Sequence, residues 1–222
     1  MRPAAVTAVL GLALAVGTPT VWSLTRPPAA AGAPVEAVLA DPTPPPRPTP
    51  PPRPSAPAGP AVATRPAGPG AVETLPAPVR LSVPARGVDA AVDAVGVEAD
   101  GQMTIPAEID RVGWYRFGPV PGEEGSAVLA GHVDSREQGL GAMAPLREAA
   151  VGDDVVVTDA TGATTTWRVV TRELIQKRVL PVDRIFARTG PPRLTLVTCG
   201  GPFLPEFGSY RDNVVVVAER VS

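Results

Sequence analysis

The sequence predicts a mainly β fold that closes into a barrel, and three observations lead to this prediction. Short segments rich in β-branched residues recur in the C-terminal part of the chain, and turn signals separate them. Helical segments do not alternate regularly with these strands, which favours a closed barrel over a doubly wound α/β fold. No repeat period is visible in the sequence.

The expected elements follow from local patterns in chain order. Runs such as DVVVTDA, TTTWRVVTREL and NVVVVAERV favour strands because branched side chains pack well on a pleated surface. Only GAMAPLREAA, residues 141–150, predicts a short helix, and VDRIFART predicts one further helical turn. The strands are expected at residues 126–131, 154–160, 164–174, 193–199 and 213–221.

An apolar segment stands near the N-terminus. Residues 4–24 carry no charge and are flanked by Arg2 and Arg26. A helix of this length spans about 30 Å, which is the thickness of a bilayer's hydrocarbon core. Residues 1–26 are therefore expected to form a transmembrane anchor with the body of the chain exported. A cleaved signal peptide is the alternative, because small residues follow at 29–33.

Residues 27–78 are rich in proline and contain 18 of the 30 prolines in the chain. Proline fixes φ and removes the backbone donor, so we expect a disordered, semi-rigid linker. A polyproline-like linker of this length reaches at most roughly 160 Å. Residues 79–222 are long enough for one folded domain with its own core. The formal net charge of −2 gives no electrostatic reason to expect nucleic-acid binding.

The chain has one cysteine, Cys199, and one histidine, His132. Each follows or ends a strand-like run, and Cys199 is followed by two glycines, Gly200 and Gly201, which let another backbone approach closely. Disulfides are the usual reason to keep cysteine in an exported protein, yet no intramolecular partner exists. A thiol beside an imidazole is the minimum for thiol nucleophilic catalysis, because a free thiol is mostly protonated at neutral pH. A buried, inert cysteine is the alternative.

Arg211 is the candidate donor for the oxyanion that acyl transfer creates. It lies twelve residues after Cys199 and just before the last expected strand. If the strands of Cys199 and Asn213 are neighbours, Cys199 and Arg211 face each other at one end of the sheet. A surface ion pair between Arg211 and Asp212 is the alternative.

These residues carry a resemblance to a known family. TLVTC, the arginine in YRDN and the upstream histidine in AGHVDS are similar to the motifs of sortases. The pair TCGG with GSYRDNVVV most resembles the class F sortases of actinobacteria. The resemblance covers residues 79–222, and the order of anchor, Pro-rich linker and C-terminal domain also matches.

The resemblance implies an eight-stranded sortase β-barrel and a cysteine transpeptidase. Cys199 would be the nucleophile, His132 the general acid and base, and Arg211 the oxyanion or substrate donor. Such an enzyme cleaves an LPXTG-like sorting signal between Thr and Gly and passes the acyl group to an amine of a peptidoglycan precursor. Its partners would be surface proteins bearing that signal, and it would act on the outer face of a Gram-positive-type membrane. Thr198 and residues 178–192 would shape the substrate groove.

No metal or other cofactor is expected. One histidine and one cysteine cannot form a zinc site, and Glu123 and Glu124 fit a solvated turn. Two rival functions remain. An L,D-transpeptidase would place its arginine much closer to the cysteine, in a short motif absent here. A non-catalytic β-rich binding domain displayed on a linker would leave Cys199 buried and unreactive.

Overall fold

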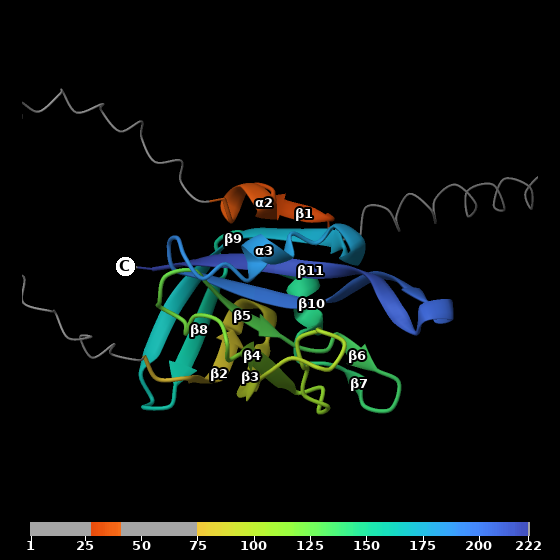
Figure 1. The fold of residues 1–222 in the computed structure, drawn as a ribbon, viewed down its shortest axis with the longest axis horizontal. Helices are drawn as coiled ribbons and strands as arrows, with labels where there is room; N and C mark the ends of the chain where they lie inside the picture. Colours follow the sequence, from red (N-terminus) through yellow and green to blue (C-terminus); the bar gives the residue numbers. More distant parts are fainter. Residues whose placement is uncertain (1–27, 41–74, 222) are drawn as a thin grey trace, which may run out of the picture.

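The computed structural model describes residues 28–40 and 75–221, and the larger range folds into a closed β-barrel (Figure 1). Eight strands follow one another around the barrel in the order β9, β11, β10, β5, β4, β3, β2 and β8, and β8 pairs back to β9. All neighbours are antiparallel except β3–β4 and β5–β10, which are parallel. The strands are β2 (Pro78–Val83), β3 (Val88–Val95), β4 (Arg111–Tyr115), β5 (Ser126–Ala130), β8 (Asp154–Asp159), β9 (Thr164–Gln176), β10 (Arg193–Leu204) and β11 (Ser209–Arg220).

This architecture confirms the predicted closed barrel. Three of the expected strands, at 126–131, 154–160 and 164–174, match β5, β8 and β9 within two residues. The strands predicted around Cys199 and Asn213 are both longer than expected, because β10 and β11 continue as a twisted hairpin closed by the 3₁₀ helix η4 (Pro205–Phe207). The sequence did not predict these strand extensions, because the glycines and prolines in GGPFLPEFG are typical of a loop.

Alternating side chains of each strand fill the barrel interior. Trp167, Leu81, Leu129, Leu194 and Leu196 are fully buried there. Burying each such side chain contributes about 1.5–3 kcal/mol. The run VVVV in β11, residues 214–217, is buried on both faces. Val214 and Val216 point into this interior cluster, whereas Val215 and Val217 belong to a second cluster outside the barrel.

Short helices connect the strands. The 3₁₀ helix η1 (Pro84–Arg86) joins β2 to β3, and η3 (Lys177–Val179) with α3 (Val182–Ile185) lies between β9 and β10. A two-stranded hairpin, β6 (Asp134–Ser135) and β7 (Gly139–Leu140), follows His132.

The helix expected at residues 141–150 is present as the 3₁₀ helix η2 (Ala144–Glu148). It is short because Ala149 adopts an extended conformation, and the Ala149 carbonyl accepts a hydrogen bond from the Arg172 guanidinium.

Residues 28–40 fall within the expected linker, but they dock on the barrel. Strand β1 (Ala30–Gly32) pairs with β9, and helix α2 (Val35–Val38) lies over β9 and β11 (Figure 1, top). Val35 and Leu39 are buried against Ile185, Val215 and Val217 on the outside of the barrel. We call this group of residues the outer cluster. The expectation of disorder is therefore wrong for residues 28–40, since this segment finds apolar partners far along the chain.

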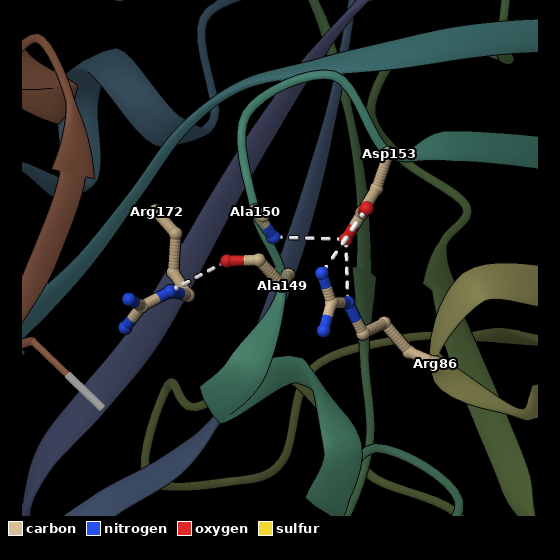
Figure 2. A network of polar contacts seen from close by, with 5 residues as sticks. All are labelled: Arg86, Ala149, Ala150, Asp153 and Arg172. Atoms are coloured by element: carbon tan, nitrogen blue, oxygen red, sulfur yellow. Dashed lines mark hydrogen bonds and ion pairs between the residues drawn. The ribbon is translucent and has the colours of Figure 1, made fainter. Parts of the chain in front are cut away.

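Polar contacts of Arg86 and Arg172 hold the segment that follows η2, residues 149–153 (Figure 2). Arg86 donates to both oxygens of Asp153, and the Ala150 amide donates to the same carboxylate. The hydrogen bond from Arg86 lowers the pKa of the Asp153 carboxyl. The buried Arg172 guanidinium donates to Ala149 O, at 2.8 Å, and to Pro28 O, at 2.9 Å. Arg172 thus joins η2 to the docked N-terminal segment.

The expected transmembrane anchor and the rest of the linker, residues 41–74, lie outside the described residues. Within the described ranges, no helix is both long enough and apolar enough to cross a membrane.

Candidate active site

Cys199 lies on β10, and His132 lies two residues after the end of β5, the parallel neighbour of β10. The register of β5 and β10 runs from Ser126 opposite Arg193 to Ala130 opposite Val197. The pairing continues past Ala130, because the Gly131 amide donates to the Val197 carbonyl at 3.2 Å. Two residues beyond Ala130 and Val197 stand His132 and Cys199. The structure therefore places both residues, which are far apart in sequence, at the same end of the paired strands.

Cys199 lies on the outer face of the barrel. Neighbouring residues of a strand point to opposite faces, and Leu196 and Thr198 are buried on the other side. Cys199 shares its face with Val197, which packs against the outer cluster, and with its cross-strand partner Asn213. The thiol is free and half-buried, and His132 is half-buried too. Both can be reached from the outside of the barrel.

Thr198 was expected to help shape the substrate groove, and the structure gives it different contacts. Its side chain is 3% exposed, so it offers almost no surface to a ligand. Its hydroxyl donates to the Gly131 carbonyl at 2.8 Å. Thr198 thus links β10 to Gly131, the residue between β5 and His132. Any effect of Thr198 on the groove is indirect.

Arg211 belongs to β11, which pairs with β10 as the sequence analysis required. Cys199 pairs with Asn213, and Arg211 stands two residues nearer the hairpin end on the same strand face. The alternative ion pair is present as well. Arg211 Nε and Nη2 donate to the two oxygens of Asp212, both at 2.8 Å. This contact raises the pKa of the Arg211 guanidinium.

Two polar residues beside the site were missed by the sequence analysis. The Tyr210 hydroxyl donates to Asp134 Oδ2 at 2.5 Å and so links the β6–β7 hairpin to the β10–β11 hairpin. This hydrogen bond raises the pKa of the Tyr210 phenol. Asp134 lies two residues after His132, and Tyr210 directly precedes Arg211. Their positions next to His132 and Arg211 were the only feature of the sequence that could have indicated them.

Residues 178–192, which the sequence analysis assigns to the substrate groove, differ in their exposure. Ile185 is fully buried in the outer cluster, whereas Val179 and Val182 are at least half exposed. Phe186 packs edge-on against Tyr115 with ring centroids 5.1 Å apart. On the other side, an open hollow of about 550 Å³ lies between η3 and the β10–β11 hairpin and reaches Tyr210 and Arg211. The site therefore has open space on the Arg211 side and an apolar surface near α3.

The part of the chain that the structure describes contains no group of three or more His, Cys, Asp or Glu side chains arranged to hold a metal ion.

The family model described as Sortase domain matches residues 81–221, a range that contains His132, Cys199 and Arg211. The chain belongs to the sortase family. Members of this family are in general cysteine transpeptidases. The match covers the barrel from β2 onward and favours this interpretation over an L,D-transpeptidase.

Solved sortase structures share the fold of this chain. Sortase A from Listeria monocytogenes matches with a TM-score of 0.50 and 24% identity, over 66% of this chain and 88% of that chain. Sortase C-1 from Actinomyces oris matches with a TM-score of 0.50 and 21% identity, over 64% and 71%. The lid mutant of sortase A from Corynebacterium diphtheriae gives 0.50 and 16%, over 64% and 69%. At these identities the likeness concerns the fold. No curated protein gives a sequence match.

Proposed function

We propose that this sortase is a membrane-anchored cysteine transpeptidase that cleaves an LPXTG-like sorting signal between Thr and Gly. The acyl group passes to an amine of the cell wall. One observation supports the proposal most: Ala130 pairs with Val197 in the parallel register of β5 and β10, and His132 and Cys199 each follow two residues later. Both residues are half-buried, Cys199 on β10 and His132 two residues after the end of β5.

In the proposed reaction, the His132 imidazole takes the Cys199 proton and the thiolate attacks the carbonyl carbon of the substrate threonine. Arg211 donates hydrogen bonds to the oxyanion of the tetrahedral intermediate. The imidazolium then gives its proton to the departing glycine amine, and a thioester remains on Cys199. An acceptor amine attacks the thioester, His132 accepts the amine proton, and the thiol is released as the new amide forms.

The finer assignments belong to the same proposal. TCGG and GSYRDNVVV support a class F sortase. Residues 4–24 support a single-pass anchor with the barrel on the outer face of a Gram-positive-type cell. The partners are then surface proteins with an LPXTG-like C-terminal signal and an amine of a peptidoglycan precursor.

Intact-mass spectrometry tests the proposal directly. Full-length protein incubated with an LPXTG-containing peptide is expected to gain the mass of the acyl fragment, and an added amine is expected to remove it as a new amide. Cys199→Ala is the control and should gain nothing. If the wild type shows neither adduct nor cleavage, and its thiol resists alkylation while folded, the displayed binding domain becomes the better interpretation.

Arg211→Lys is expected to lower the acylation rate about a hundredfold, although the positive charge is kept. A planar guanidinium offers several directed donors, whereas an ammonium acts as a point charge. The rate is read from release of the glycine-containing fragment. Arg168→Lys is a matched control, because Arg168 also pairs with an aspartate, Asp154, on the barrel wall. Equal rates for Arg211→Lys and the control would reduce Arg211 to a structural residue.

A further inference from the structure

Asp212 is a buried carboxylate next to an exposed arginine. The Asp212 side chain is 2% exposed, whereas that of Arg211 is 47% exposed. Burying a carboxylate is costly unless it is paired and hydrogen-bonded. Arg211 supplies both hydrogen bonds that reach the Asp212 carboxylate from a side chain in the described part of the chain. The carboxylate therefore holds the guanidinium in place as much as the guanidinium compensates the carboxylate.

The contact between them fixes an orientation. Nε and Nη2 of Arg211 meet the two oxygens of Asp212 at equal distances of 2.8 Å, which is the bidentate geometry of a guanidinium and a carboxylate. A guanidinium has five N–H donors, so this contact leaves three free, two of them on Nη1. Because the plane of the group is set by Asp212, the direction of these free donors is set as well.

Gly201 makes room for the carboxylate. Its φ is +73°, and a Cβ placed there would lie 2.2 Å from Asp212 Oδ2. The pairing of β10 and β11 shifts between Gly200 and Phe203, so the chain bulges at this point. The second glycine of TCGG is thus required by the position of Asp212. Any larger residue would have to displace the carboxylate that orients Arg211.

We infer that Asp212 is a positioning residue that orients the Arg211 guanidinium in advance of catalysis, with Gly201 as the residue that permits it. Asp212 is too deeply buried to touch a substrate and acts through Arg211. An arginine side chain has substantial rotamer entropy, and a group held in place beforehand loses less of it when the oxyanion forms. This inference rests on the proposed function, in which Arg211 donates to the oxyanion.

A double-mutant cycle tests it in the full-length protein with an LPXTG peptide. Asp212→Asn keeps the shape of the side chain but turns an NH₂ group toward one Arg211 donor. We expect kcat/KM for acylation to fall about tenfold to a hundredfold, since hydrogen bonds to charged groups are of that strength. In an Arg211→Ala background, followed over hours, Asp212→Asn should change the remaining rate less than twofold. Equal losses in both backgrounds would show a merely structural role and overturn the inference.

Two glycine variants give an independent comparison. Gly201→Ala should reproduce the loss caused by Asp212→Asn, because its Cβ occupies the place of Oδ2. Gly208→Ala is the matched control in the same hairpin, since Gly208 also has a positive φ, +57°, but its Cβ would meet nothing within 4 Å. The control should keep wild-type acylation. If Gly201→Ala behaves like Gly208→Ala, backbone strain is the only shared effect and the role of Asp212 is rejected.

An activity-independent measurement separates this inference from the proposed function. With ¹⁵N-labelled arginine, the Nε–H signal of Arg211 is assigned by its disappearance in Arg211→Lys. It should exchange slowly with solvent in the wild type and rapidly in Asp212→Asn. If the wild type forms no thioester, the proposed function is wrong. The positioning of Arg211 by Asp212 is then tested by this exchange alone. Slow exchange retained in Asp212→Asn would overturn it.

Discussion

Replacing His132 with alanine is expected to lower the rate of LPXTG-peptide cleavage about a thousandfold, which is the usual scale for a lost general acid and base. Cys199→Ala is expected to abolish cleavage, because alanine has no nucleophile. The parallel register of β5 and β10 provides the reason, since the only imidazole and the only thiol in the sequence each follow two residues after the paired Ala130 and Val197. A free thiol has a pKa of about 8.5 and needs a base near neutral pH.

The measurement is release of the C-terminal fragment by chromatography, with thermal unfolding followed in parallel. Both variants should keep the wild-type unfolding midpoint within a few degrees, because neither side chain is in the core. Added imidazole should restore part of the rate in His132→Ala and none in Cys199→Ala. Cleavage retained by Cys199→Ala would refute the assigned chemistry. So would a His132→Ala protein that cleaves at the wild-type rate and does not respond to imidazole.

Val35→Asp is expected to destabilise the protein by about 3 kcal/mol or to release residues 28–40 from the barrel. Val35 is fully buried in the outer cluster against side chains of α3 and β11. A charge there would lie among apolar side chains. The protein can avoid the cost only by undocking α2 and giving up the pairing of β1 with β9.

Urea unfolding of the full-length protein measures the loss, and protease cleavage within residues 28–40 reports release of the segment. Ala37→Asp introduces the same side chain on the exposed side of α2 and should change stability by no more than about 0.5 kcal/mol. Val35→Asp with the stability and protease resistance of Ala37→Asp would show that the docking of α2 contributes nothing.

The barrel was predictable from sequence because its strands carry their signal locally. Val214 to Val217 and the runs around Trp167 are β-branched and bounded by turns. The docked segment was not predictable, because APVEAVLA is short and lies among prolines. Its stability comes from strands far along the chain: β9, whose Glu173 accepts a hydrogen bond from the Val35 amide 138 residues away, and β11, which lies further still. Contacts at such a separation leave no periodicity to read.

At the candidate site, residue types were more informative than geometry. The solitary cysteine and histidine pointed to each other by chemistry, and their register required the structure. For Arg211 the sequence left two neighbours open, Cys199 and Asp212; the structure shows the ion pair with Asp212 and puts Arg211 two residues from Asn213, the cross-strand partner of Cys199. The burial of Asp212 and the space that Gly201 leaves for it arise from a bulge, which no local pattern in TCGGPF indicates.

The docking of residues 28–40 changes how far the barrel can stand from a membrane. With residues 4–24 in the bilayer, as the sequence predicts, the chain from Leu24 to Pro28 spans no more than about 15 Å even when fully extended. Residues 41–74 leave the barrel at Ala40 and return to it at Leu75, so they add nothing to that distance. Under the proposed function, the barrel is then held against the lipid surface, and the proposed cleavage of sorting signals would take place as they emerge from the membrane.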